Sequence, residues 1–455
     1  MRKNKRIVGL ALAMAMSAST FTALAAQSGW VLDGNDWYHY DNEGEMEYDV
    51  WRGYTDGNKY YLGEEGAMLR SQLVDDEYYV NSSGARVSNE WRLVDIDDEE
   101  DSRWMFFGEN AKSYKNGWKT INGQRYHFDD AGHMDYGWLD AEGNMVDTDG
   151  EFDENSWKEA TYYCGDNTTG WRVQDQWVAV TEFDDTDDQY GDKEVVWLYF
   201  DNNGKKVVSK SKAIDGKKYM FDENGAMVTE WYGSATPSDA EYKHYDEETG
   251  YLAKGKWFQA VPSLEQDADD YYEDTLRWFY ASKTGETYKN TIKKIDGKRY
   301  IFDENGIMKT GFIVVDENSA IVDVLGNAED NEMPTADELK EIDLTTGSLM
   351  YFNENGARET GKMTIALEDD TYTLKFESNG EAAHGVDDNY LYDHGILIKA
   401  TENKYEVATV DGKDFLVNKS GKVQKAGSYK DGAEGLVYTV VGNNTDGFEI
   451  SVVTE

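Results

Sequence analysis

A pattern of alternating aromatic and polar positions, closed by a polar turn, recurs along most of the chain. Residues 299–312 read RYIFDENGIMKTGF, and the same form returns as KYMFDENGAMVTEW at 218–231 and RYHFDDAGHMDYGW at 125–138. Because side chains alternate between the two faces of a strand, Tyr300 and Phe302 share one face. The DENG segment then supplies turn residues, including a glycine that can adopt positive φ. The pattern predicts a β-hairpin at each copy.

The copies indicate a repeat architecture rather than a single large core. A lone hairpin is marginally stable in water, so its aromatic face must be covered, and a neighbouring copy can cover it. We therefore expect an all-β solenoid of stacked β-hairpin repeats. A tyrosine-rich β-sandwich is the alternative, which the recurrence of Y-x-F-D-x-x-G disfavours. The copies occupy residues 37–46, 60–68, 78–87, 126–134, 198–207, 219–227, 244–252, 279–287, 300–308, 351–358, 374–382 and 415–423.

Short hairpins alternate with hairpins expanded by acidic loops. The expanded ones enclose runs such as DIDDEEDS, DDTDDQYGDK and EQDADDYYED, and each is followed by a plain short copy. We infer a module of one long and one short hairpin, used four times, whose loops project on one side of the solenoid. The long hairpins span 91–107, 177–200, 257–280 and 312–352, and the short ones span 118–134, 214–227, 292–308 and 363–380.

The first 26 residues read as a secretory signal peptide. Basic residues precede a short apolar run, and a small-x-small cleavage signal follows at Ala23-Leu24-Ala25. A membrane anchor is the alternative, but the apolar run is too short to span a bilayer. The expected organisation is a signal peptide at 1–26, a hairpin solenoid at 27–384, and degenerate terminal repeats or a cap at 385–455. We expect a secreted protein of the bacterial cell wall or surface without a transmembrane segment.

Charge and cysteine content narrow the possible partners. The chain has 90 acidic and 45 basic residues, a formal net charge of −45. Such a field repels nucleic acid and anionic lipid, which excludes them as partners. Cys164 is the only cysteine, so an intrachain disulfide is impossible. The acidic loops remain candidates for loose cation binding or for contact with a protein partner.

The aromatic repeat resembles the choline-binding and glucan-binding repeats of bacterial cell-wall proteins. The fullest match is GWVLDGNDWYHYDNEGEMEYDVW at residues 29–51. The resemblance implies ligand cages between neighbouring hairpins, built from aromatic rings and a methionine. A quaternary ammonium is attracted to ring faces, a sugar ring can stack on an indole, and methionine fills such gaps. The implied ligand-binding residues are Trp30, Trp37, Met46 and Trp51, followed by Trp118, Tyr126, Met134 and Trp138.

One position distinguishes a binding copy from a purely structural copy. Arg125 stands where the resembled family has a cage tryptophan, and Lys59, Lys218 and Arg299 take the same position in other copies. A cation there repels a choline headgroup, so tryptophan at this position favours binding and lysine or arginine favours scaffold. By this criterion the first copy is the place to look for a ligand.

Catalytic and metal signatures are weak in this sequence. The six histidines form no H-E-x-x-H motif, and no G-x-S-x-G or Cys/His signature occurs. The segment DTDGEFDEN at 147–155 resembles half of a calcium loop but fails its register. We therefore expect no enzyme activity, no metal site and no cofactor.

The predicted function is non-catalytic binding of cell-wall polysaccharide or of choline on teichoic acid through the aromatic pockets. The alternative is a structural or adhesive surface protein whose acidic loops contact a host or surface protein.

Overall fold

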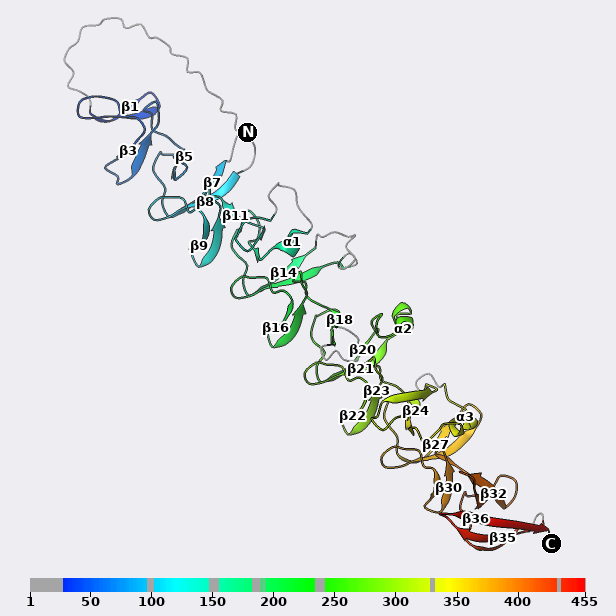
Figure 1. Ribbon diagram of the computed structural model, residues 1–455. Helices are drawn as coiled ribbons and strands as arrows, with labels where there is room; N and C mark the ends of the chain where they lie inside the picture. The colour runs from blue at the N-terminus through cyan, green and yellow to red at the C-terminus, as the bar shows by residue number, and fades with distance from the viewer. Residues whose placement is uncertain are drawn as a thin grey trace, which may run out of the picture. The chain divides into compact units, whose positions relative to one another are not determined.

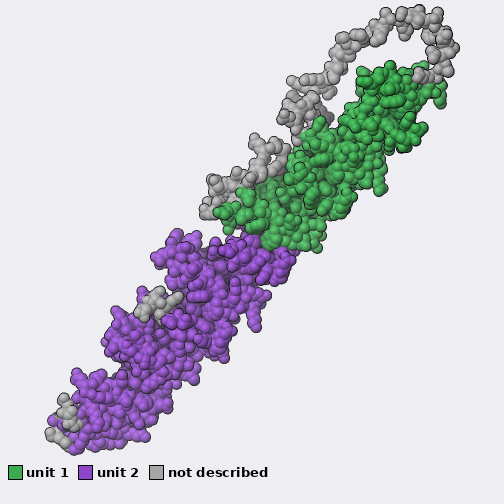
Figure 2. All heavy atoms as spheres, turned by 180° about the vertical axis from the view of Figure 1, so that it is seen from behind, with its two compact units in different colours: residues 1–208 green, residues 209–455 purple. Residues whose placement is uncertain are grey.

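A computed structural model describes residues 28–95, 102–146, 155–181, 190, 193–233, 242–327, 332–431 and 435–454. The expected signal peptide at 1–26 lies outside these residues. So do most of the acidic runs DIDDEEDS and DDTDDQYGDK and the segment DTDGEFDEN. The chain divides into two compact units, Met1–Val208 and Ser209–Glu455 (Figures 1 and 2).

Unit 1 consists of antiparallel hairpins that follow one another in chain order. Strands pair as β1–β2, β3–β4, β5–β6, β7–β8, β9–β10, β12–β13 and β14–β15, and β11 adds to β10. Among the described residues of this unit the elements are β1 (Gly29–Asp33), β2 (Asp36–Tyr40), β3 (Val50–Gly53), β4 (Lys59–Leu62), β5 (Gln72–Val74), β6 (Tyr78–Val80), β7 (Glu90–Asp95), β8 (Ser102–Phe107), β9 (Gly117–Ile121), β10 (Gln124–Phe128), β11 (Met134–Asp135), β12 (Trp138–Leu139), α1 (Ser156–Glu159), β13 (Tyr162–Tyr163), β14 (Gln176–Val180) and β15 (Val196–Phe200).

Unit 2 begins with the same kind of hairpin and ends in larger sheets. Its two-stranded sheets are β16–β17, β18–β19, β20–β21, β22–β23 and β32–β33. Its described elements are β16 (Lys210–Ile214), β17 (Lys217–Phe221), β18 (Glu230–Tyr232), β19 (Lys243–Tyr245), β20 (Lys256–Ala260), α2 (Ala268–Tyr272), β21 (Arg277–Ala281), β22 (Thr291–Ile295), β23 (Lys298–Phe302), β24 (Gly311–Val315), β25 (Ile321–Leu325), α3 (Ala336–Lys340), β26 (Ser348–Phe352), β27 (Gly361–Ala366), β28 (Thr371–Phe376), β29 (Gly385–Asp387), β30 (Tyr390–Asp393), β31 (Ile396–Leu397), β32 (Tyr405–Val410), β33 (Lys413–Asn418), β34 (Gly427–Asp431), β35 (Leu436–Asn443) and β36 (Gly447–Thr454).

The hairpins form where the sequence predicts them, for the expected reasons. In the DENG turn, the Asp303 carboxylate accepts hydrogen bonds from the backbone N–H groups of Asn305 and Ile307, at 3.0 and 2.8 Å. Gly306 then adopts a φ of +86°, which only glycine enters without steric cost. The phenylalanine before the turn, Phe302, is fully buried. The predicted all-β fold of stacked hairpin repeats is confirmed.

One backbone hydrogen bond recurs between successive hairpins and sets their register. After most of the turns, the returning segment donates an N–H to a carbonyl in, or directly before, the second strand of the preceding hairpin. In unit 1 the Met68 N–H donates to the Trp37 carbonyl at 2.8 Å, and in unit 2 the Met308 N–H donates to the Trp278 carbonyl at 2.9 Å. We call the donating residue the donor position and the accepting residue the acceptor position. This bond brings the side chains of the two positions to the same junction.

The expanded connections contain short helices as well as loops. α1 lies between β12 and β13, α2 lies between β20 and β21, and α3 lies between β25 and β26 (Figure 1). Arg277 at the start of β21 pairs with Asp270 of α2 through two hydrogen bonds of 2.7 Å. None of the described helices has the length and apolar run that a bilayer crossing requires.

The C-terminal part of unit 2 contains the largest sheets. Strands β27, β28, β31, β30 and β29 form one five-stranded sheet, and β34, β35 and β36 form a three-stranded one. The five-stranded sheet covers residues 361–397, so the expected start of the terminal segment at residue 385 falls inside it. Its core combines aliphatic and aromatic side chains, with Leu374 fully buried and Phe376 and Ile396 nearly so. Leu339 of α3 and Leu349 of β26 pack in the same cluster and cover one face of this sheet.

Candidate aromatic ligand site

An aromatic pocket lies where the first hairpin meets the second. Trp30 of β1 and Trp37 of β2 line it together with Tyr60 of β4 and Met68, which follows β4. The rings of Trp30 and Tyr60 meet edge to face, with centroids 5.6 Å apart and planes at 74°. Met68 occupies the donor position opposite Trp37. Two hairpins therefore share the walls of this pocket, which we call cage 1.

A carboxylate lies at the edge of cage 1. Asp56, in the β3–β4 turn, lines the pocket and accepts a hydrogen bond from the Tyr60 hydroxyl at 2.6 Å. That bond lowers the pKa of Asp56, with help from the Asn58 backbone N–H, and raises the pKa of Tyr60. Asp56 is therefore ionised at neutral pH beside ring faces that themselves attract cations. This chemistry favours a small organic cation.

The first predicted set of site residues is only partly brought together. Trp30 and Trp37 both line cage 1. Met46 is 40% exposed and lies against Gly66 of the next hairpin. Trp51 belongs to the following junction, where its ring lies 5.4 Å from that of Tyr78. The methionine of cage 1 comes from the second hairpin, because the donor position follows the turn of the later copy.

The second predicted set is distributed over three junctions. Tyr126 contacts Trp91 of the preceding hairpin at 4.9 Å between ring centroids, and Met134 packs in the same cluster. Trp118 faces the following hairpin and lies 5.1 Å from Tyr162. Trp138 packs on its strand partner Tyr163 at 4.3 Å. These residues belong to one copy in the sequence. Because side chains alternate between strand faces and each hairpin has a neighbour on either side, they contact different hairpins.

Within the single units, two further junctions of described residues carry the side-chain types of cage 1. Cage 2 contains Trp91, Trp104, Tyr126 and Met134, which pack in one cluster. Cage 3 contains Trp257, Trp278 and Tyr300, with Met308 at the donor position through its backbone bond to Trp278. In cage 3 the Trp257 centroid lies 6.4 Å from that of Trp278 and 4.7 Å from that of Tyr300. Each of these two junctions joins a long hairpin to the short hairpin after it.

Trp104 and Trp278 are the members that sequence reasoning missed. Each stands at the position of Trp37, three residues before the strand residue that bridges to the returning segment, as in Tyr40 with Met46 and Phe107 with Ser113. The expanded loops separate Trp104 from Trp91 and Trp278 from Trp257, so neither pair reads as G-W followed by W-Y. Counting backward from the turn, rather than forward from the first tryptophan, would have found them.

Arginine closes two other junctions. Arg86 takes the donor position between the second and third hairpins, and its guanidinium lies 5.2 Å from the Trp51 ring centroid and 5.3 Å from that of Tyr78. Arg172 does the same between Trp118 and Tyr162, at 5.2 and 5.7 Å. In both junctions the protein supplies its own cation to the aromatic faces.

Arg125, the basic residue at the acceptor position, also lies at the junction that Arg172 closes. Arg125 lies over Trp118 at 5.6 Å, so a positive residue there does accompany a junction closed by arginine. Arg125 thus lies at the junction between its own hairpin and the next one. Tyr126, from the same hairpin, lies at the junction with the preceding hairpin. A short hairpin can therefore carry arginine at the acceptor position and still complete a cage.

The single cysteine offers no reactive group. Cys164 is fully buried, and burial raises the pKa of its thiol to about 12. The thiol therefore stays protonated and unreactive at neutral pH.

The repeat class of these hairpins is given by family comparison. Residues 45–86 match the family described as choline-binding repeat, and residues 28–46 and 116–134 match the family described as putative cell wall binding repeat. These matched segments contain every residue of cage 1. The chain thus carries choline-binding and cell-wall-binding repeats.

Curated relatives of the chain are streptococcal enzymes. Glucosyltransferase-S of Streptococcus downei is 25% identical over 256 residues, which is 56% of this chain and 14% of that protein. Glucosyltransferase-I of the same species is 25% identical over 322 residues, which is 64% of this chain and 19% of that protein. The chain therefore matches less than a fifth of the length of these relatives.

Solved structures with local similarity come from Streptococcus pneumoniae. The modular autolysin LytC aligns with a TM-score of 0.38 and 15% identity, covering 63% of this chain and 54% of that one. CbpJ aligns with a TM-score of 0.37 and 17% identity, covering 78% of this chain and 99% of that one.

Proposed function

We propose that the protein is a secreted, non-catalytic cell-wall-binding protein that holds choline of teichoic acid in cage 1. The observation that carries the proposal is the combination of Trp30, Trp37 and Tyr60 with the ionised Asp56 in one pocket. A quaternary ammonium has no N–H to donate, so it gains most from ring faces and from a carboxylate at their edge. The choline-binding repeat match over residues 45–86 supports the same ligand.

Cages 2 and 3 extend the proposal to the expanded hairpins. Each combines two tryptophans from a long hairpin with a tyrosine and a methionine from the next short one. Each site alone would bind choline weakly. Several sites on one chain would together bind tightly to a polymer that presents many choline groups. The proposed location is the bacterial cell wall or surface.

A glycan is the second candidate ligand, because the relatives at 25% identity are glucosyltransferases. A sugar ring can stack on the exposed faces of Trp30 or Trp37 without using a charge. The structural or adhesive alternative, in which acidic loops contact another protein, stays a prediction, since most of those runs lie outside the described residues.

The deciding experiment compares choline with a neutral glucan oligosaccharide on three full-chain variants. Trp37→Ala removes a wall of cage 1, Asp56→Asn removes only its charge, and Tyr48→Ala, an exposed ring outside the pocket, is the matched control. Binding is followed by tryptophan fluorescence and by sedimentation with purified cell walls in the presence and absence of excess choline.

The choline proposal predicts that Trp37→Ala abolishes binding in cage 1 and that Asp56→Asn weakens choline about three- to tenfold. A glycan site would lose binding in Trp37→Ala and keep it in Asp56→Asn. If the wild-type protein does not sediment with cell walls, the wall-binding function is wrong.

A further inference from the structure

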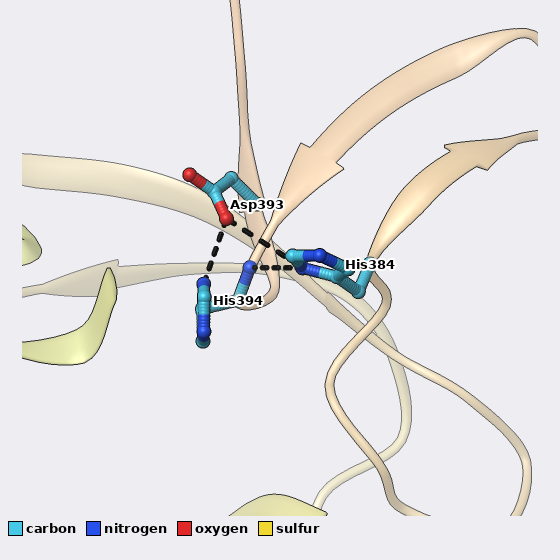
Figure 3. Close-up of side chains that lie close together, drawn as sticks. All are labelled: His384, Asp393 and His394. Carbon is cyan, nitrogen blue, oxygen red and sulfur yellow. Dashed lines mark hydrogen bonds and ion pairs between the residues drawn. The ribbon is translucent and has the colours of Figure 1, made fainter. Parts of the chain in front are cut away.

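Two histidines and an aspartate converge in the C-terminal part of unit 2, and none of them belongs to a cage. The Nδ1 atom of His394 lies 2.7 Å from Asp393 Oδ1, and the Nδ1 atom of His384 lies 3.5 Å from the same oxygen (Figure 3). One ligand atom from each of the three residues lies within 4.8 Å of the other two. Both imidazoles thus direct the same ring nitrogen toward one carboxylate.

The outer nitrogen of each ring is held by an oxygen acceptor. His394 Nε2 lies 2.9 Å from the Ile342 carbonyl, and His384 Nε2 lies 3.0 Å from Asp411 Oδ2. His384 Nδ1 accepts the backbone N–H of His394 at 3.3 Å, which assigns the ring proton of His384 to Nε2. His394 Nδ1 lies 2.7 Å from the Asp393 carboxylate, so without a metal it donates a proton that a bound ion would displace. His384 Nδ1 would likewise exchange its long bond to the His394 N–H for the ion. The outer N–H of each ring would then keep its oxygen acceptor, which is the usual arrangement of a metal-ligating histidine.

The scaffold fixes the three ligands from one sheet. Asp393 ends β30 and pairs with Ile396 of β31, while His394 and Gly395 form the tight turn between them with φ of +50° and +84°. His384 directly precedes β29, whose Gly385 pairs with β30. The side chains of His384, Asp393 and His394 are half-buried to buried, with 23%, 20% and 10% exposure. Ligands placed by strands and a two-residue turn have little freedom to separate.

We propose that His384, Asp393 and His394 bind a divalent transition metal ion of the Zn²⁺ class. Two imidazole nitrogens and one carboxylate oxygen are typical Zn²⁺ ligands, and water would complete a tetrahedral site. Bonds of about 2 Å place tetrahedral ligands roughly 3.3 Å apart, and the observed separations of 2.7 and 3.5 Å bracket that value. Ca²⁺ and Mg²⁺ prefer oxygen ligands, so two imidazoles disfavour them.

A bound ion would connect segments that lie far apart in the sequence. Through the second shell it links Ile342, which follows α3, and Asp411, in the β32–β33 turn, to the five-stranded sheet. Metal binding would therefore stabilise the C-terminal part of unit 2 without involving the aromatic cages.

The test titrates the full chain with Zn²⁺ by calorimetry, and with Co²⁺ by absorption, in a large excess of Mg²⁺. Excess Mg²⁺ occupies loose carboxylate sites on this acidic chain, and Co²⁺ reports tetrahedral nitrogen and oxygen ligation in its visible spectrum. The variants are His384→Gln, Asp393→Asn and Asp411→Asn. His133→Gln is the matched control, because His133 also pairs with an aspartate, Asp129, at 3.1 Å.

The expected result is one Zn²⁺ per chain, lost in His384→Gln and Asp393→Asn, about tenfold weaker in Asp411→Asn, and unchanged in His133→Gln. Protection of His384 and His394 from diethylpyrocarbonate by Zn²⁺ tests the wild-type protein directly, should a variant fold poorly. Equal Zn²⁺ binding by wild type and His384→Gln, or no binding above the Mg²⁺ background, would show that the cluster is only an ion-paired turn and would overturn the proposal.

Discussion

At the scale of the residue, the side chain at the donor position distinguishes cages 1 and 3 from the junctions closed by arginine. Met68 in cage 1 and Met308 in cage 3 occupy the donor position, where Arg86 and Arg172 stand in the closed junctions. In cage 1 the methionine lines a pocket together with the rings, whereas the Arg86 guanidinium covers two ring faces at once. The same backbone bond therefore supports either an aromatic site or a cation–π contact that holds two hairpins together.

Arg86→Met should open a new cation site between Trp51 and Tyr78. Methionine is already accepted at this position in cages 1 and 3, so the variant should fold. We expect choline to shift the indole N–H resonance of Trp51 in Arg86→Met and not in the wild type, measured by NMR titration. Arg86→Lys is the control, because it retains a cation at the junction. A Trp51 resonance that is insensitive to choline in Arg86→Met would contradict the view that Arg86 closes this junction.

His244 should make the stability of unit 2 depend on pH. It is buried between Trp231 and Phe258, and its Nε2 has no hydrogen-bond partner among the described residues. Burial lowers its pKa from 6.5 to about 4, with smaller effects from Asp246 and Lys256. Between these two pKa values the unfolded chain binds the extra proton, so stability is complete above pH 6.5 and falls as the pH drops toward 4.

The His244→Phe variant should lose this contribution, about 3 kcal/mol over that range. Urea unfolding of wild type and variant at about pH 7.5 and about pH 4 measures the change in the free energy of unfolding. His133→Gln serves as the control. An identical decline in both proteins would mean that other groups cause the acid sensitivity.

At the scale of the element, the turn glycines do more than permit positive φ. Gly123 and Gly132 belong to the same three-stranded sheet and have φ of +85° and +98°. A Cβ on Gly123 would meet nothing within 4 Å, whereas one on Gly132 would lie 2.9 Å from Met105 Cε and 3.1 Å from the Tyr114 carbonyl. Gly132 is therefore the place where the turn of one hairpin rests on the hairpin before it.

Gly132→Ala should destabilise the protein more than Gly123→Ala. The φ strain is common to both and costs roughly 1–2 kcal/mol, while the contact with the preceding hairpin applies only at residue 132. Thermal unfolding of the two variants should show a clearly lower midpoint for Gly132→Ala. Equal midpoints would mean that packing of the Gly132 turn against the preceding hairpin contributes nothing to stability.

The hairpins themselves could be predicted from the sequence, because alternation and turn chemistry are local. Tyr300, Phe302 and the DENG turn read directly as strand and turn, and the structure agrees. The grouping of site residues could not be predicted in the same way. Trp91 and Tyr126 belong to different copies, and Trp104 stands behind an acidic run. Whether these side chains come into contact depends on the register between hairpins. The sequence pattern within one copy does not indicate that register.

The histidine cluster was missed for the same reason. His384 and His394 show no ligand spacing of a known motif, and the pairing of β29 with β30 is what brings them together. The sequence therefore allowed the individual hairpins to be predicted and gave little information about what lies between them.

At the scale of the whole molecule, several weak cages on one acidic chain should act together. With a net charge of −45, general attraction to an anionic wall polymer is absent, so retention depends on the cages. We expect Trp37→Ala and Trp278→Ala each to lower wall retention modestly, and the double variant to lower it by more than the product of the single effects. Retention on purified walls at several choline concentrations measures this. A double variant that matches Trp37→Ala would show that cage 3 does not contribute.

The recurrent donor and acceptor positions also bear on how such a chain can change in evolution. Most of the described hairpins present a carbonyl to the copy after them or an N–H to the copy before them, at fixed places relative to the turn. A duplicated pair of a long and a short hairpin would therefore find compatible neighbours on both sides. Recombination between copies can lengthen or shorten the gene by whole pairs, and each added pair of this kind would bring its two tryptophans, its tyrosine and its methionine already in register.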